Sequence, residues 1–209
     1  MKPLLPLLRT LGRHCSSPAA PIDTAAKQTF GGMSQQTFTK LVEEMCPFVK
    51  NIMPLEVLNI AKGKLTVKLP FKPDYIGNAL VPAMHGGVAA SIIDHVGGFA
   101  AWSCIDSPQS MIATIDLRID YLRPAPLEDL ECEGKVIHFG PKKQLIRVDI
   151  ALYSSKDKDR YKPIATGRGT WKSYFAKQLL DNADTVAAIV DGGTMQGAID
   201  KLVEKAETK

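Results

Sequence analysis

The stretch from Met84 to Cys104, MHGGVAASIIDHVGGFAAWSC, decides the fold of this chain. It opens with a histidine and two glycines and continues as an apolar segment long enough for about five helical turns. A helix that is apolar on nearly every side is expected to be buried. One carboxylate, Asp94, interrupts it, and a buried carboxylate is costly without a partner. We therefore predict a central buried helix whose polar residues are candidates for a functional site.

The start of this predicted helix, His85-Gly86-Gly87, is a candidate site for an oxyanion or a polarised carbonyl. The first backbone N–H groups of a helix have no partner within it and lie at the positive end of its dipole. Glycines leave these N–H groups sterically open. Two glycines alone are more typical of a plain turn, and Asp94 in the same helix is what favours a site.

Segments on both sides of this helix are predicted to form one antiparallel sheet. A short amphipathic helix over 35–46 is expected first, ending before Pro47. The expected strands are 55–60, 64–69, 111–122, 130–139, 144–153 and 161–174. A sheet wrapped round one apolar helix satisfies this order, so the predicted fold class is α+β.

The predicted strand at 111–122 alternates between apolar and polar residues. Its two expected faces are Ile115, Leu117, Ile119 and Tyr121 on one side, and Thr114, Asp116, Arg118 and Asp120 on the other. Strict alternation therefore places Thr114 on the charged face.

The two ends of the chain are expected to lie outside the central domain at 35–174. Residues 1–34 begin with a basic, serine-containing segment that has no acid before Asp23, which is typical of a mitochondrial presequence. The alternative is a disordered tail without a targeting signal, on a cytoplasmic protein. Apolar residues in 175–209 predict a C-terminal extension of two short helices.

Composition argues against several classes of function. The net charge of +4 is mild and forms no basic stripe, so nucleic-acid binding is not indicated. No apolar run reaches the length of a membrane span. The four cysteines and four histidines are scattered without the spacing of metal sites. We expect a reduced, intracellular protein without a metal or other cofactor.

Three motifs together resemble the hotdog-fold acyl-CoA thioesterases. They are HGG at 85–87 with Asp94 nine residues after the histidine, TIDLRIDYLRPA at 114–125 and ATGRGT at 165–170. The likeness is strongest to the group of bacterial phenylacetyl-CoA thioesterases and mammalian mitochondrial-associated acyl-CoA thioesterases. The resemblance implies a hotdog fold, an antiparallel sheet wrapped round a long central helix. It also implies hydrolysis of an acyl-CoA to the free acid and coenzyme A.

The resemblance implies roles for individual residues. Gly86 corresponds to the glycine whose N–H polarises the thioester carbonyl, and Asp94 to the carboxylate that acts as nucleophile or general base. Thr114 falls where related enzymes carry a Ser or Thr that orients the attacking water. His85 would position the loop, and Asn78 resembles an asparagine upstream of the motif. A structural Asp94 at a dimer interface and an ordinary strand residue at Thr114 are the alternatives.

Candidates for substrate binding are Gly87 beside the carbonyl site and several basic side chains. Arg123, Lys142, Lys143 and Arg168 could bind the phosphates of coenzyme A. Solvated charges at turns and strand ends are an equally fitting interpretation of each.

The spacing of Gly86 and Asp94 indicates an oligomer. Eight residues span about 12 Å along a helix, much more than the length of an aspartate side chain. Asp94 therefore cannot easily reach a carbonyl bound at the start of its own helix. A neighbouring subunit's antiparallel helix could supply it, and hotdog thioesterases pair in this way. We expect a homodimer or a dimer of dimers.

Other functions fit the same fold. A non-catalytic hotdog oligomer that binds acyl-CoA or serves as a scaffold is the main alternative, and the presence of Asp94 argues against it. A hotdog hydratase or dehydratase usually shows an Asp/His arrangement that this sequence does not match.

Overall fold

The computed structural model describes residues 30–78, 80, 82–107, 110–140, 144–158 and 160–175. Most of the presequence-like segment, Lys142, Lys143 and the expected C-terminal helices lie outside these residues. Described packing begins at Phe30, which is 2% exposed and contacts Phe38 at a ring-centroid distance of 6.0 Å.

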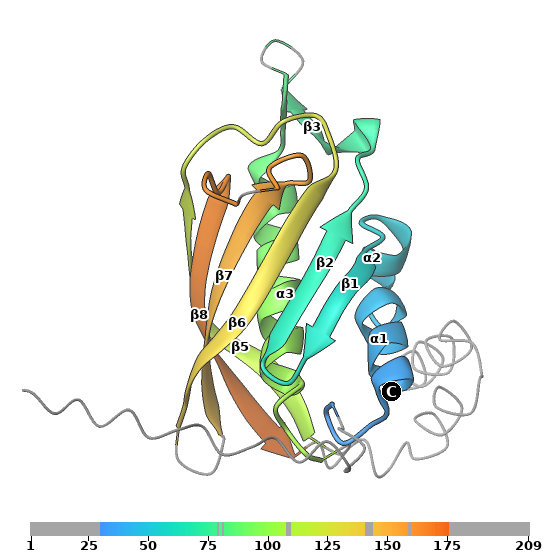
Figure 1. The fold of residues 1–209 in the computed structure, drawn as a ribbon, viewed down its shortest axis with the longest axis vertical. Helices are drawn as coiled ribbons and strands as arrows, with labels where there is room; N and C mark the ends of the chain where they lie inside the picture. The colour runs from blue at the N-terminus through green and yellow to red at the C-terminus, as the bar shows by residue number, and fades with distance from the viewer. Residues whose placement is uncertain are drawn as a thin grey trace, which may run out of the picture.

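One antiparallel sheet wraps round one long helix (Figure 1). The sheet has six strands in the spatial order β1-β2-β6-β7-β8-β5. The strands are β1 (Glu56–Ala61), β2 (Lys64–Leu69), β5 (Ser110–Tyr121), β6 (Leu130–Phe139), β7 (Leu145–Ser154) and β8 (Ala165–Phe175). The helix is α3 (Gly86–Trp102). This arrangement confirms the predicted α+β fold with a sheet round a central helix.

The segment before β1 forms two helices where the sequence predicted one. Helix α1 (Gln35–Glu44) starts at Ser34, whose hydroxyl accepts a hydrogen bond from the Thr37 N–H at 3.2 Å. Pro47 follows the end of α1, as expected, but it also begins a second helix, α2 (Pro47–Asn51). Proline suits the first position of a helix because its missing N–H would have no partner there.

The connection between β2 and α3, where the sequence predicted neither a helix nor a strand, contains a short helical turn and two short strands. A short 3-10 turn, Pro73–Tyr75, leads to β3 (Ile76–Asn78), which pairs with β4 (Ala83–Met84). The backbone N–H of His85 then donates to the carbonyl of Tyr75 at 2.7 Å. These contacts fix the point at which α3 begins.

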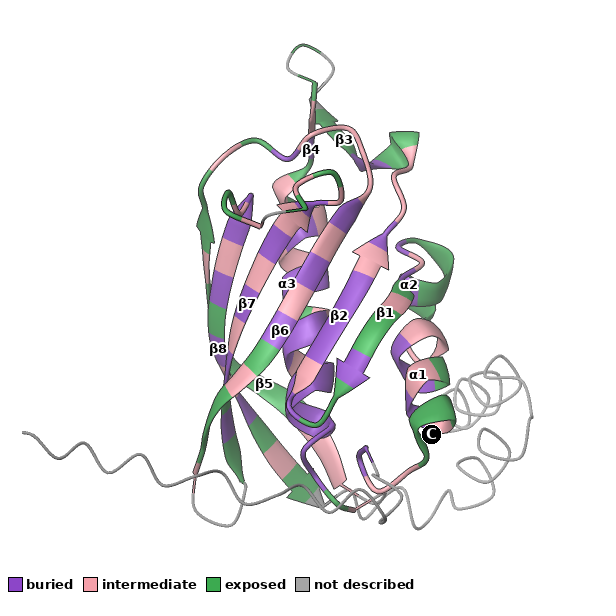
Figure 2. Cartoon of the chain, in the orientation of Figure 1, coloured by how far each residue is buried: buried purple, intermediate pink, exposed green. Residues whose placement is uncertain are grey.

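The core lies between α3 and the inner face of the sheet (Figure 2). Trp171 on β8 is 1% exposed and packs directly against the helix. A Cβ added at Gly97 would lie 2.3 Å from Cη2 of Trp171, and one added at Gly169 would lie 2.7 Å from the same atom. The two glycines therefore form the notch that accepts the indole ring.

His95 is partly buried and links α3 to α1. Its Nε2–H donates to the carbonyl of Val42 at 2.8 Å, and its ring lies 4.7 Å from that of Phe99. Burial lowers the pKa of His95, outweighing the hydrogen bond to Val42 and the charge of Asp94, which raise it. The folded structure therefore favours neutral His95.

Replacing Gly97 by alanine should lower stability by about 1–3 kcal/mol, because the new methyl group overlaps the Trp171 ring. Gly98→Ala is the matched control. Its Cβ would lie 3.4 Å from Nε1 of Trp171, an ordinary contact, and alanine is the better helix former. Thermal melts should show a lower Tm for Gly97→Ala alone, and equal Tm values for both variants would contradict the packing argument.

Protonation of His95 should destabilise the fold as the pH falls below about 6.5. Because the pKa is lowered on folding, the unfolded chain binds this proton first, so stability decreases as pH drops from the unfolded value toward the folded one. Urea unfolding at about pH 7.5 and about pH 5.5 measures the effect. His95→Gln keeps a neutral donor for Val42 and should lose much of the decrease; an identical decrease in both proteins would assign it to other groups.

Candidate active site

One side of α3 is not covered by the sheet. Gly87 and Asp94 are exposed there, although the rest of the helix is largely buried. The expectation that Asp94 is buried is wrong for the single subunit, because its side chain is exposed on this uncovered side of the helix. Any desolvation of the carboxylate must come from a second chain or a ligand.

Among the described residues, the N–H groups of Gly87 and Val88 in the first turn of α3 have acceptors, and that of Gly86 has none. The Nδ1 atom of His85 accepts the N–H of Gly87 at 2.9 Å and caps the helix. Gly87, predicted to bind substrate, thus has its N–H satisfied internally, whereas Gly86 can still donate.

A hollow of about 410 Å³ lies beside this open N–H. It runs between the start of α3 and residues 121–125 and includes Gly86, Ala89 and Arg123. The hydroxyl of Tyr121 donates to the carbonyl of Gly86 at 3.2 Å and fixes one wall. Gly86, the residue with the open N–H, thus lines a hollow at the start of α3.

A bulge in β5 corrects the predicted position of Thr114. The register with β8 shifts between Thr114 and Asp116, so that Thr114 pairs with Trp171 and Leu117 pairs with Gly169. The extra residue at Ile115 turns Thr114 onto the inner face, away from the charged residues with which alternation grouped it. There its hydroxyl donates to Oδ1 of Asp94 at 2.9 Å.

A second hollow, which we call the slot, opens beside the Asp94–Thr114 pair. It has a volume of about 150 Å³ and lies between α3, the end of α1, β5 and β8. Apart from Asp94, Thr114 and His95, its walls are apolar or glycine: Met45, Gly98, Phe99, Trp102, Met111, Ile112 and Trp171. The carboxylate thus lies at the edge of an apolar, partly aromatic space.

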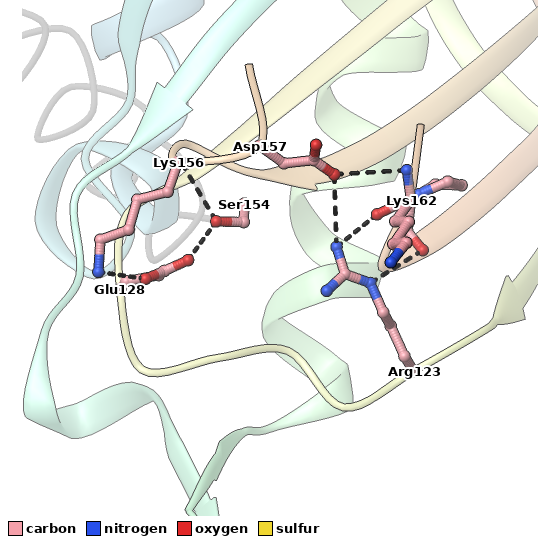
Figure 3. Close-up of polar contacts among 7 residues, drawn as sticks. Arg123, Glu128, Ser154, Lys156, Asp157 and Lys162 are labelled. Carbon is pink, nitrogen blue, oxygen red and sulfur yellow. Dashed lines mark hydrogen bonds and ion pairs between the residues drawn. The ribbon is translucent and has the colours of Figure 1, made fainter. Parts of the chain in front are cut away.

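The predicted phosphate-binding residues do not form one cluster. Arg123 donates to the carbonyls of Lys162 and Pro163 and lies 3.8 Å from Asp157 (Figure 3). Arg168 pairs with Asp149 at 2.5 and 2.7 Å, on β8 and β7. Asn78 contributes its backbone to β3, and its side chain lies outside the described atoms, as do Lys142 and Lys143.

The structure adds basic residues near Arg123 that sequence reasoning missed. A hollow of about 530 Å³ is lined by Arg123, Lys156, Tyr161 and Lys162, among others. Lys156 pairs with Glu128 at 2.5 Å, and this contact lowers the pKa of the carboxyl group (Figure 3). The sequence showed Lys156 only in the turn between two expected strands and Lys162 only at the start of the second one, and no local signal places either beside Arg123.

Among the described residues, no group of His, Cys, Asp and Glu side chains is arranged to hold a metal ion. Within the same part of the chain, no helix is long and apolar enough to cross a membrane.

Comparison with known proteins identifies relatives of this chain. Residues 82–158 match the thioesterase superfamily. A predicted esterase of Saccharolobus solfataricus is 32% identical over 104 residues, covering 48% of this chain and 71% of that protein. The medium/long-chain acyl-CoA thioesterase YigI of Escherichia coli is 29% identical over 130 residues, covering 53% of this chain and 81% of YigI.

A solved structure shows the same fold. The protein from Shewanella oneidensis related to the thioesterase superfamily superimposes with a TM-score of 0.55 at 25% identity, covering 66% of this chain and 93% of that one. Together with the sequence match and the sheet wrapped round α3, this similarity establishes that the chain belongs to the thioesterase superfamily and has its hotdog fold.

Proposed function

We propose that this protein is an acyl-CoA thioesterase that hydrolyses an acyl-CoA to the free acid and coenzyme A. The observation that carries the proposal is the pair of features on the open side of α3. One is the N–H of Gly86, which has no acceptor in the described part of the chain, and the other is the Asp94 carboxylate held by Thr114. An electrophile activator and a base are what thioester hydrolysis requires.

The two features suit successive parts of one reaction. The Gly86 N–H donates to the thioester oxygen and stabilises the negative charge that develops on it. Asp94 accepts a proton from the attacking water, or attacks the carbonyl carbon itself. Thr114 orients the carboxylate through its hydrogen bond. The thiolate of coenzyme A then leaves and takes up the proton that Asp94 accepted from water. Where Asp94 itself attacks, the acyl–Asp94 anhydride is hydrolysed by water, which gives the free acid and supplies the proton for the thiolate.

Two copies of the chain are needed to bring the features together. Gly86 and Asp94 lie on the same helix and line different hollows. Strand β5 is an edge of the sheet, and Ile115 on it is 57% exposed. An unpaired edge of this length is a template for another strand.

Pairing through β5 would complete the site. The hollow at Gly86 borders residues 121–125, beyond one end of β5, and the slot borders Met111 and Thr114 near the other. An antiparallel pair of β5 strands centred near Leu117 therefore brings the Asp94 end of one copy to the Gly86 end of the other. We propose this homodimer, alone or as half of a tetramer, as the active form.

Coenzyme A would extend from the Gly86 hollow across Arg123. The neighbouring hollow contains Lys156, Lys162 and the ring of Tyr161, which is 84% exposed. Ammonium groups suit phosphates, and an exposed aromatic ring can stack on a base. Membership of the phenylacetyl-CoA or mitochondrial-associated group, and a mitochondrial location, are further parts of this proposal that rest on the sequence.

Asp94→Asn should reduce thiol release from acyl-CoA by about 100- to 10,000-fold, because it removes the base or nucleophile and keeps the side-chain size. Asp116→Asn is the matched control on the same strand as Thr114 but on the opposite face of the sheet. The assay uses a panel of acyl-CoAs, with the oligomeric state checked for each protein. Full activity in Asp94→Asn would remove Asp94 from the mechanism, and an inactive, folded wild type would favour the non-catalytic oligomer.

A mixed-dimer experiment tests whether the site is shared between subunits. Gly86→Pro removes the N–H at a helix position where proline is well tolerated, and His85 has the extended backbone that a following proline requires. Each variant alone should be inactive. When subunits of this variant and of Asp94→Asn pair at random, half the dimers contain one subunit of each kind. In such a dimer, one of the two sites combines an unchanged Gly86 with an unchanged Asp94.

About a quarter of wild-type activity should therefore return after unfolding and refolding the two variants together. Absence of any recovery, with mixed dimers detected by mass spectrometry, would place both residues in one subunit's site.

A further inference from the structure

We infer that Arg160 is a positioning residue, which holds the turn between β7 and β8 in the shape that binds the nucleotide end of coenzyme A. This inference rests on the proposed function and adds a residue that lies outside the substrate hollows. The described part of the turn comprises residues 155–158 and 160–164. Several of its side chains line the hollow that contains Arg123, whereas Arg160 does not.

The backbone of Arg160 is strained. Its φ angle is 50°, and no other residue except glycine has a positive φ in the described part of the chain. A residue with a Cβ adopts this left-handed conformation at a cost in free energy, so surrounding contacts must stabilise it. Strain that is kept in a turn therefore indicates that contacts outside the turn determine its shape.

Three contacts of the Arg160 side chain supply this stabilisation. Its Nη1 atom donates to Glu133 at 2.6 Å, and its Nη2 atom donates to Glu131 at 2.7 Å. Both carboxylates belong to β6. The guanidinium carbon also lies 5.6 Å from the centre of the Tyr153 ring on β7, which is within the distance of a cation–π interaction. The turn is thus tied to two strands that are fixed in the sheet.

The other side of the turn is held by Arg123. Its Nε and Nη2 atoms donate to the carbonyls of Pro163 and Lys162, and Asp157 accepts the N–H of Lys162 at 3.3 Å (Figure 3). The Nη1 atom of Arg123 has no acceptor among the described residues, and the side chain of Lys162 is exposed. The two sets of contacts therefore fix the position of Lys162 relative to Arg123, as suits a phosphate that contacts both.

A turn that is already ordered lowers the cost of binding. A ligand that must order a loose loop loses part of its binding free energy to the entropy of that loop. Arg123 lines both this hollow and the hollow at Gly86, so the turn meets the part of coenzyme A that is remote from the thioester. The carboxylates in the hollow are already paired, Glu128 with Lys156 and Asp157 with Arg123. The benefit of the ordered turn should therefore appear in binding rather than in the chemical step.

The test compares an acyl-CoA with the same acyl group on pantetheine, which lacks the nucleotide. Arg160→Asn removes the guanidinium but keeps a residue that tolerates a positive φ. KM for the acyl-CoA should rise about tenfold while kcat stays unchanged, because only binding of the remote part is weakened. Both constants for the acyl-pantetheine should stay within about twofold of the wild type, since this substrate does not reach the turn.

Glu131→Gln separates a holding role of Arg160 from direct contact with a phosphate. This change weakens one acceptor of Arg160 and removes a negative charge from β6. A holding role predicts a KM for the acyl-CoA about threefold higher. Attraction of phosphate to the more positive surface predicts a lower KM. The matched control is Lys158→Ala, which removes a positive charge from the same turn at an exposed residue outside the hollow and should change KM by less than about twofold.

Tm and oligomeric state are measured for every protein, and Glu131→Gln, which changes no residue of the turn, decides the question if Arg160→Asn does not fold. Equal losses on both substrates would make Arg160 a support of the whole fold. A lower KM in Glu131→Gln would make Arg160 a direct phosphate ligand, and an unchanged KM in both variants would remove it from binding. Each of these results overturns the inference and keeps the thioesterase. A folded wild type that hydrolyses no acyl-CoA would overturn the thioesterase and the inference together.

Discussion

The close approach of α3 to the sheet is the constraint on which the rest of the structure depends. It requires a position without a side chain at Gly97 on the helix and another at Gly169 on β8, so that Trp171 fits between them. The ring then fixes the separation of helix and sheet. That separation defines the slot, and the position of the helix across the sheet determines which of its residues stay uncovered.

The uncovered side of α3 carries the candidate catalytic groups. The helix start presents the Gly86 N–H because His85 has already satisfied that of Gly87. Two turns further on, the helix presents Asp94 toward β5. A bulge in that strand supplies the hydroxyl of Thr114 to the carboxylate. Each feature is a local consequence of backbone geometry, and the two are held apart by the length of the helix between them.

This separation explains why an edge strand matters to the proposed chemistry. Strand β5 runs along the open side of α3 with one edge unpaired, and its two ends border the two hollows. A two-fold pairing of β5 reverses one copy relative to the other, which is the operation that brings unlike ends together. It would also shield Asp94 from water, which the single subunit does not do.

The sequence by itself determined the central helix, the succession of the six main strands along the chain and the candidates Gly86 and Asp94, because hydrophobic periodicity and glycine placement are local signals. It misassigned the face of Thr114, because a bulge depends on the register with a partner strand. It also missed Lys156 and Lys162, which meet Arg123 only when two distant loops fold together. The tertiary structure decided these points, since register, volume and neighbourhood are properties of contacts between segments rather than of any one segment.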